Sequence, residues 1–439
     1  MITQEPDAKQ FTPALIRTTM TFAMLAALCA MSWAASEKVL YSFHGGDGWG
    51  GGSVIVGPKG TLYGATGGGG TCAGLGCGVI FRLARGTSGK WHETVLHDFA
   101  GSDGEFPGTL ALDKAGNLYG TTFNGGTGCG YGCGVVFQLK RGTGGKWTYK
   151  VLHFFDVTDG AEPDGTLIFD SRGSLYGTAS AGGNISACYN EGGCGLVFKL
   201  TPDKKGNWSE TVVYAFNGQD GGGPSGIIFD SPGNLYGTNS YGGANQGGTV
   251  FKLSPGKHGE WTEEVLHSFS YGTRDGDEPS DGIVFDTSGN LYGTTTFGGM
   301  NGPQGWGTAF KLTPTGGGKW EETIVHRFDR AKFGGGYVSS GAVLDQQGNL
   351  YGAANWGGRY KCPTGGGLGC GVVFKLTPTA KGKWGETVLH SFGKGNDGSG
   401  PGALILDSFG RLYGVAYQGG YTGYPCGPDG CGVVFEVTP

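Results

Sequence analysis

The chain has 439 residues, and glycine (96) and proline (18) together make up about a quarter of it. Because the glycines recur at regular intervals between apolar runs, they indicate turns between strands and exclude a low-complexity chain. Lysine and arginine (31) nearly balance aspartate and glutamate (36), the net charge is -5, and no run of like charge stands out. This pattern argues against a nucleic-acid partner.

The start of the chain has the pattern of a signal peptide. Lys9 and Arg17 precede an apolar stretch at residues 20–31, and small residues follow it. We therefore expect residues 1–34 to be removed and the mature protein to be exported, either secreted or held in the periplasm or at the cell surface. The apolar stretch is too short to span a bilayer comfortably, and we expect no transmembrane segment in the mature chain.

One unit of about 57 residues then recurs seven times. In each unit a short apolar run (strand A) leads through a D-x-x-G turn to the string LYG (strand B). A glycine-rich loop leads to a GVVF-x-L run (strand C), and a G-x-W-x-E turn leads to a VLH-x-F run (strand D). The LYG tyrosines are Tyr63, Tyr119, Tyr176, Tyr236, Tyr292, Tyr351 and Tyr413. Turn residues at each junction predict four strands per unit, and no segment has the apolar period of a helix.

Seven units of four antiparallel strands predict an all-β fold, a seven-bladed β-propeller, as a single domain over residues 35–439. A β-solenoid is the rival fold for a glycine-rich repeat. The two ends of the repeat region favour the propeller, because residues 39–43 form an isolated strand D and residues 432–439 a strand C without its strand D. We therefore predict that the N-terminal strand pairs with the last blade and closes the ring, which also removes exposed sheet edges.

The segments GNLYGTT, GVVF-x-L and W-x-E-T-V-L-H-x-F, repeated in this order, resemble the bacterial GloVer-type tandem repeat of "choice-of-anchor" surface proteins. The resemblance covers about residues 37–439. It implies an exported, propeller-like protein whose biochemical activity is not established.

Ten cysteines form five local pairs, each placed between LYG and strand C. The pairs are Cys72/Cys77, Cys129/Cys133, Cys188/Cys194, Cys362/Cys370 and Cys426/Cys431. Zinc is the rival interpretation, but each pair offers only two thiolates without a nearby histidine, fewer than a structural zinc site needs. In an exported protein we predict five disulfides.

Repeated polar residues are better explained by architecture than by chemistry. The D-x-x-G aspartates bind the backbone of their own turns, because one carboxylate per turn is too few for calcium. The histidines of VLH-x-F recur around the ring and therefore cannot form one catalytic centre. We predict no metal, no cofactor and no catalytic residue from these motifs.

The D–A loops repeat the pattern D-G-x-x-P and supply the first group of candidate binding residues, Asp103, Asp159, Asp220, Asp275 and Asp397. As turn residues, these aspartates would accept hydrogen bonds from the backbone. Alternatively, they would form an acidic ring around the channel mouth, reinforced by Glu105, Glu162, Asp277 and Glu278, that holds a cation or a basic group.

The B–C loops carry an aromatic residue just before Gly-Gly and supply the second group, Phe123, Tyr241, Phe297, Trp356 and Tyr417, with Asn124 beside the first. These rings would either plug the space against the next blade or provide flat faces for a sugar or a peptide. The predicted function is a monomeric binding or scaffold module for a carbohydrate or protein ligand on the disulfide-bearing loop face. The alternative is a hydrolase or lyase that acts on a polysaccharide or lactone with acidic residues at the channel mouth.

Overall fold

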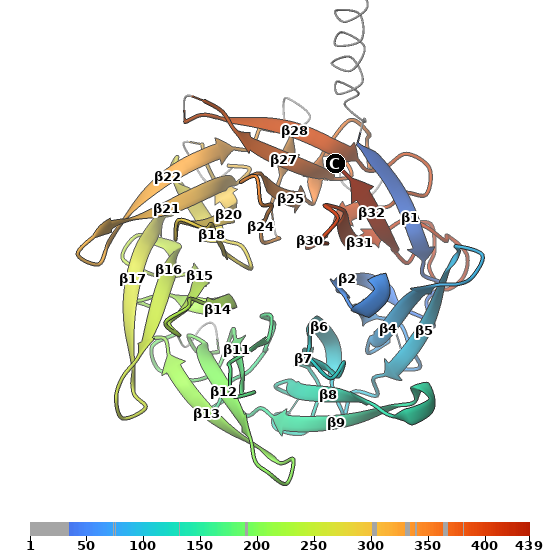
Figure 1. Cartoon of the computed structure of the whole chain (residues 1–439), viewed down its shortest axis with the longest axis horizontal. Helices are drawn as coiled ribbons and strands as arrows, with labels where there is room; N and C mark the ends of the chain where they lie inside the picture. Colours follow the sequence, from blue (N-terminus) through green and yellow to red (C-terminus); the bar gives the residue numbers. More distant parts are fainter. Residues whose placement is uncertain are drawn as a thin grey trace, which may run out of the picture.

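The computed structural model describes residues 35–439 except residues 73, 75, 131, 189–191, 301–304, 330–333, 339, 363–367 and 381. The predicted signal peptide, residues 1–34, lies outside the described residues. The described chain forms seven antiparallel sheets of four or five strands arranged in a ring, and one further two-stranded sheet that belongs to the sixth blade (Figure 1). This arrangement confirms the predicted seven-bladed β-propeller. Helix in the described part of the chain is limited to two single 3-10 turns, η1 (Pro58–Gly60) and η2 (Thr143–Gly145).

The strands follow one another from the inside of each blade to the outside. Blade 1 consists of β2 (Trp49–Val56), β3 (Leu62–Gly68), β4 (Val79–Arg85) and β5 (Trp91–Asp98), and blade 2 of β6 (Glu105–Leu112), β7 (Leu118–Asn124), β8 (Val135–Arg141) and β9 (Trp147–Phe154). Blade 3 consists of β10 (Ile168–Phe169), β11 (Leu175–Ala179), β12 (Leu196–Pro202) and β13 (Trp208–Ala215). Blade 4 consists of β14 (Gly222–Phe229), β15 (Leu235–Tyr241), β16 (Gln246–Pro255) and β17 (Trp261–Ser270).

Strand A is interrupted in the last three blades. Blade 5 consists of β18 (Gly276–Pro279), β19 (Val284–Phe285), β20 (Leu291–Gly298), β21 (Thr308–Gly316) and β22 (Lys319–Arg327). Blade 6 consists of β23 (Gly335–Gly336), β24 (Val343–Leu344), β25 (Leu350–Ala354), β26 (Trp356–Gly357), β27 (Val372–Pro378) and β28 (Trp384–Ser391). Blade 7 consists of β29 (Ser399–Pro401), β30 (Ile405–Leu406), β31 (Leu412–Gln418), β32 (Val433–Thr438) and β1 (Ser36–Ser42).

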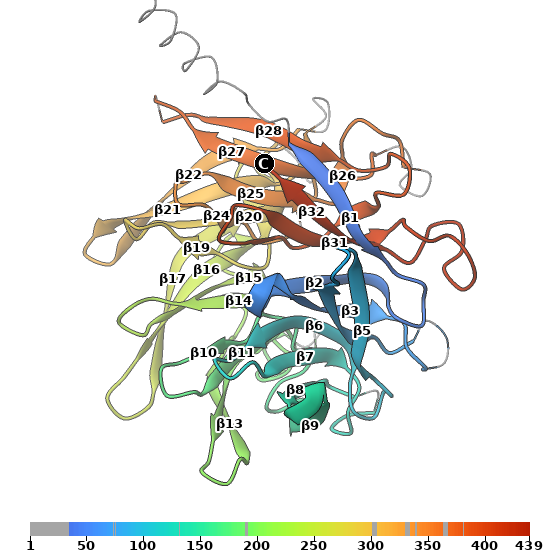
Figure 2. The same ribbon diagram turned by 45° about the vertical axis from the view of Figure 1, so that its right-hand side comes forward.

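The first strand of the described chain closes the ring. β1 pairs antiparallel with β32, from Ser36 opposite Thr438 to Ser42 opposite Val433. Figures 1 and 2 show β1 lying beside β32 as the outer strand of blade 7. The predicted closure by the N-terminal strand is therefore confirmed.

The LYG string is a packing element of strand B. Tyr119 is buried, its hydroxyl donates to Asp113 Oδ2 at 3.3 Å, and its ring meets Trp208 of the next blade edge-on, with centroids 5.9 Å apart. A Cβ at Gly120 would lie 2.6 Å from the Phe137 ring of strand C, too close for any side chain. Each of the seven LYG glycines meets a strand C phenylalanine in this way. The string therefore recurs because every blade needs one.

The D-x-x-G aspartates close the A–B turns, as predicted. Asp113 Oδ1 accepts the backbone N–H groups of Ala115 and Asn117 at 2.9 and 2.8 Å. The corresponding turn contacts are present at Asp170, Asp230, Asp286, Asp345 and Asp407.

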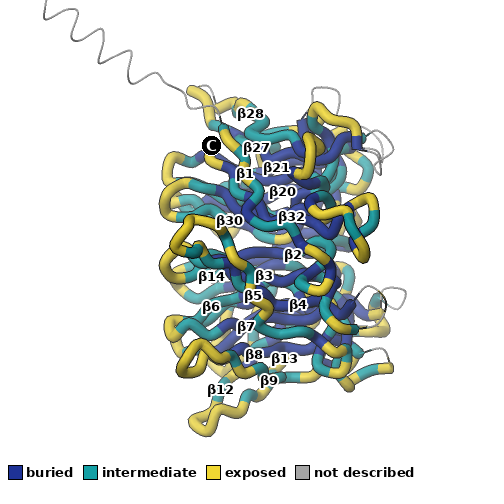
Figure 3. Tube along the Cα trace, turned by 90° about the vertical axis from the view of Figure 1, so that its right-hand side faces the viewer, coloured by how far each residue is buried: buried dark blue, intermediate teal, exposed yellow. Residues whose placement is uncertain are grey.

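Aromatic side chains form the core between neighbouring blades. Phe155, which ends the VLH-x-F run of blade 2, is fully buried and packs against Phe198 of blade 3 with ring centroids 5.0 Å apart. Burying one such ring contributes roughly 1.5–3 kcal/mol. Figure 3 shows the result from the side, with a buried central band and exposed residues at the two faces of the disc.

The B–C and D–A loops lie on the same face of the disc, which we call the loop face. Gly126 N in a B–C loop donates to Gly101 O in the neighbouring D–A loop at 2.8 Å, and Gly243 N donates to Gly218 O in the same way at 2.9 Å. Because loops on a rigid scaffold are the usual place for binding residues, the loop face is where a site is best sought.

Candidate functional site

A cavity of about 310 Å³ opens on the loop face where the A strands begin, and we call it the channel mouth. Its lining combines two carboxylates, Asp164 and Asp281, with three aromatic side chains, Phe106, Phe123 and Tyr417. A second cavity of about 300 Å³ is lined by the A strands of several blades and also contacts Asp281. Asp281 therefore belongs to both cavities.

Asp164 and Asp281 come from two of the three blades in which the chain has one extra residue near the start of strand A, and in the third, blade 6, Ser340 takes the corresponding position. The interval from the loop aspartate to the turn aspartate runs from Asp159 to Asp170 in blade 3, one residue longer than from Asp103 to Asp113 in blade 2. Blade 5 shows the same lengthening relative to blade 4. Neither Asp164 nor Asp281 was among the predicted site residues. The lengthened intervals were the signal in the sequence that could have identified them.

A second local feature recurs near the start of strand A, and in blade 2 it places Phe106 in the lining of the channel mouth. One residue near the start of strand A has positive φ in every blade: Gly50, Phe106, Glu162, Gly223, Glu278, Tyr337 and Gly400. For a residue other than glycine, this left-handed backbone conformation costs roughly 1–2 kcal/mol of free energy. The conformation lets the backbone N–H groups of Phe106 and Glu162 donate to carbonyls of the preceding blade at 3.0 and 3.1 Å. Strained residues of this kind cluster at functional sites.

The two carboxylates of the channel mouth influence each other. Both are exposed to the cavity, while the surrounding blades keep bulk solvent away from most of their surroundings. This poor hydration raises the pKa of Asp164, and burial together with the charge of Asp164 raises the pKa of Asp281. A hydrogen bond from Ser225 to Asp281 acts in the opposite direction. The pair therefore retains a proton at higher pH than two separate surface aspartates.

Tyr417 separates the channel mouth from a neighbouring opening of about 240 Å³ over blades 6 and 7. Trp356 and Gln418 also line this second opening, which we call the side groove. Space for the Tyr417 ring exists because residue 51 is glycine, since a Cβ there would lie 1.8 Å from the ring. Burial, and then the charges of Asp164 and Asp281, raise the pKa of the Tyr417 hydroxyl. The ring therefore lies within electrostatic reach of both carboxylates.

The structure brings together three of the five predicted B–C aromatics, Phe123, Trp356 and Tyr417, along these two openings. The other two pack against neighbouring blades. Tyr241 donates its hydroxyl to Gly193 O at 3.1 Å, and Phe297 meets Tyr337 edge-on with centroids 5.0 Å apart. Asn124 lies at the end of strand B opposite Glu105, and its carbonyl accepts the Thr122 hydroxyl at 2.8 Å.

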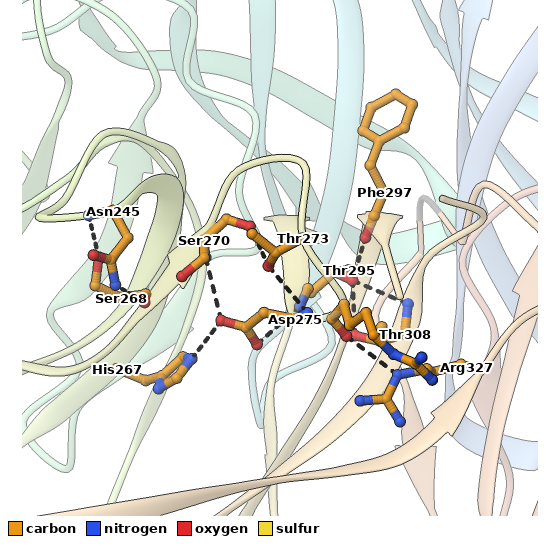
Figure 4. Close-up of polar contacts among 12 residues, drawn as sticks. Asn245, His267, Ser268, Ser270, Thr273, Asp275, Thr295, Phe297, Thr308 and Arg327 are labelled. Carbon is orange, nitrogen blue, oxygen red and sulfur yellow. Dashed lines mark hydrogen bonds and ion pairs between the residues drawn. The ribbon is translucent and has the colours of Figure 1, made fainter. Parts of the chain in front are cut away.

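The structure does not bring the predicted loop aspartates together into a ring at the axis. Each one faces the histidine or tyrosine of its own strand D. The distance from the histidine Nε2 to the aspartate Oδ2 is 3.0 Å for His97–Asp103, His153–Asp159 and His390–Asp397, and 3.5 Å for His267–Asp275, and the Tyr214 hydroxyl lies 2.7 Å from Asp220. Asp275 also accepts the Ser270 N–H at 3.2 Å (Figure 4). These contacts match the turn interpretation of the motif.

Four of the five predicted disulfides are present: Cys72–Cys77, Cys129–Cys133, Cys188–Cys194 and Cys426–Cys431. Cys362 and Cys370 differ from the prediction, because both are buried free thiols. The two thiols are joined by a hydrogen bond. Burial, and then this hydrogen bond, raise the pKa of Cys370 to about 12.

Seven blades built on one strand pattern define the molecule as a β-propeller repeat protein. The Gloeobacter/Verrucomicrobia repeat, as a protein family, matches residues 27–193 and 185–424. The chain therefore belongs to the Gloeobacter/Verrucomicrobia repeat family, which confirms the resemblance carried by the LYG, GVVF and VLH-x-F segments. No described helix has the length and apolar character needed to cross a membrane.

Solved structures are similar to the chain in fold at low sequence identity. The extracellular domain of BT3049 from B. thetaiotaomicron aligns with a TM-score of 0.51 and 12% identity, over 92% of this chain and 41% of that chain. The gluconolactonase XC5397 from Xanthomonas campestris aligns with a TM-score of 0.43 and 12% identity, over 94% of this chain and 92% of that chain. No curated protein matches the chain.

Proposed function

We propose that this protein is an exported, monomeric propeller that binds a carbohydrate chain across its channel mouth. The observation that carries the proposal is the position of Tyr417, whose ring is shared by the acidic mouth and the side groove. A ligand that lies over this ring would reach both openings at once. Export is supported by the four disulfides, because such bonds persist in oxidising compartments.

The lining suits a sugar chain better than a uniformly apolar ligand. Tyr417 and Trp356 offer aromatic faces for the apolar side of a sugar ring. The side groove adds the polar side chains of Asn355, Ser399 and Gln418, and the mouth adds two carboxylates that accept hydroxyl protons. Concave sites with a few convergent polar groups are typical of small-ligand binding.

A glycan array on the purified chain, followed by calorimetric titration of the best ligand, tests the proposal. Tyr417→Ala is expected to weaken binding by about 5–30-fold, the loss of roughly 1–2 kcal/mol of aromatic contact. The matched control is Phe409→Ala, which removes a ring that is 81% exposed in an A–B turn on the opposite face. If the Tyr417→Ala variant binds the glycan as tightly as the unmodified protein, the proposal is wrong. If the chain binds a peptide and no glycan, the ligand is a protein.

A hydrolase or lyase is the second candidate, and Asp164 and Asp281 are the observation that favours it. Two interacting carboxylates whose pKa values are both raised can divide the roles of acid and base. If the protein cleaves the glycan that it binds, Asp164→Asn and Asp281→Asn should each abolish product formation while binding persists. Product formation that survives both substitutions would exclude these carboxylates from the chemistry.

A further inference from the structure

A polar cluster lies between the outer strands of neighbouring blades, and we call it the outer seam. An outer seam contains the histidine or tyrosine of VLH-x-F, the W-x-E position of the next blade and, except between blades 5 and 6, the aspartate of the D–A loop between them. Between blades 2 and 3 these residues are His153, Asp159 and Glu210, and between blades 4 and 5 they are His267, Asp275 and Glu322.

These two outer seams bring together three groups that bind metals. In each of them, one imidazole nitrogen and two carboxylate oxygens lie within 4.8 Å of one another. The groups come from two blades, since His267 and Asp275 belong to blade 4 and Glu322 lies on β22 of blade 5. Figure 4 shows His267 directed at Asp275, which the Ser270 and Gly276 N–H groups hold in place at 3.2 and 2.9 Å.

The third member of each cluster has one carboxylate oxygen without a hydrogen-bond partner among the described residues. Glu210 Oε1 and Glu322 Oε1 are buried, and neither has a hydrogen-bond partner in the described part of the chain. A buried carboxylate oxygen without a donor is costly, so the arrangement is incomplete without a proton or a cation.

We propose that these two outer seams are zinc sites that join blade 2 to blade 3 and blade 4 to blade 5. Zinc takes imidazole nitrogen and carboxylate oxygen as ligands, and with three protein ligands a water molecule can fill the fourth position. Its two positive charges balance the two carboxylates of each site. The backbone N–H groups on Asp275 act as outer contacts that orient a ligand. The proposal does not depend on the function proposed for the channel mouth, and it replaces the expectation of no metal.

The outer seam between blades 6 and 7 holds the same three residue types, Glu37, His390 and Asp397, but their ligand atoms do not all lie within 4.8 Å of one another. Two other outer seams lack one of the three ligands and serve as internal comparisons. Tyr214 takes the place of the histidine beside Asp220 and Glu263. Tyr149 takes the place of the glutamate beside His97 and Asp103, and its ring stacks on His97 at a centroid distance of 3.8 Å. A two-ligand seam should bind zinc far more weakly than a three-ligand seam.

Zinc titration of the metal-free full chain, followed by elemental analysis after dialysis, tests the proposal. The background is Cys362→Ser/Cys370→Ser, because the two free thiols could bind zinc themselves. Because metal ligands bind best when they have lost their protons, the titration is done at about pH 8, and we expect about two zinc ions per chain. His153→Gln and His267→Gln should each remove one ion, and the double variant should bind none.

Two further variants keep the test decisive. His97→Gln changes a two-ligand seam and should leave the zinc content unchanged. Tyr214→His completes a third cluster with Asp220 and Glu263, and it should add one ion. Circular dichroism of each variant confirms that it is folded. No zinc on the unmodified outer seams, or the same zinc content in the folded His153→Gln/His267→Gln protein, would overturn the proposal.

Discussion

Replacing Glu263 with glutamine should stabilise the ring above neutral pH. Glu263 lies at the outer seam between blades 3 and 4, where Tyr214 leaves no third metal ligand. Its Oε1 is buried and accepts no hydrogen bond from the described residues. Burial, and then the charges of Asp220 and Glu264, raise the pKa of Glu263 to about 7, against 4.5 for an ordinary glutamate.

The direction of the pH effect follows from the raised pKa. The folded protein binds this proton more tightly than the unfolded chain, so the stability linked to it is complete below about pH 4.5 and is lost as the pH rises through about 7. The full difference corresponds to roughly 3 kcal/mol. Because solvent still reaches part of the side chain, we expect about 1–2 kcal/mol. Glutamine carries no charge and avoids this loss.

Chemical denaturation of both proteins between about pH 4.5 and pH 8.5 measures the difference. The Glu263→Gln variant should be more stable by about 1–2 kcal/mol at the upper limit, and the advantage should disappear toward the lower limit. Glu321→Gln is the control, because this glutamate is exposed on β22 and its charge is not among the causes of the raised Glu263 pKa. A Glu263→Gln advantage that is absent at high pH, or constant across the range, would refute the reasoning.

Three further predictions concern the fold. A variant without β1 should lose cooperative unfolding and form oligomers in size-exclusion chromatography, because β32 then has an exposed edge; a monomer with unchanged unfolding would contradict the closure. Gly120→Ala should cost about 1–3 kcal/mol in denaturation, since its Cβ meets the Phe137 ring, and Phe137→Leu in the same chain should recover part of this loss; absence of recovery would locate the strain elsewhere. Cys72→Ser/Cys77→Ser should cost at most about 2–3 kcal/mol, and reductant should have less effect on this variant than on the unmodified protein.

The blade number and the ring closure could be predicted from the sequence because they depend on features that repeat. LYG marks strand B in every blade, since Gly120 and its equivalents must clear a phenylalanine ring. Closure could be inferred from the isolated strand D at residues 39–43, because a ring needs that strand to complete its last blade.

The channel mouth could be predicted only in part, because it depends on departures from the repeat. Tyr417 and Trp356 were found by their position before Gly-Gly, but the same position in Tyr241 and Phe297 holds packed rings. Whether a B–C aromatic side chain lines an opening depends on the residues that it packs against. Tyr417 lines both openings because residue 51, beside its ring, is glycine. Asp164 and Asp281 could not be predicted from the repeat, because their position is not aspartate in the other blades.

The crystal structure of the chain with its best-binding glycan tests the central claim most directly. The account predicts a sugar ring stacked on Tyr417, with hydroxyl groups donating to Asp164 or Asp281 and the rest of the ligand in the side groove beside Trp356. A glycan bound on the opposite face beside Phe409, or on the loop face without contact to Tyr417, would contradict it.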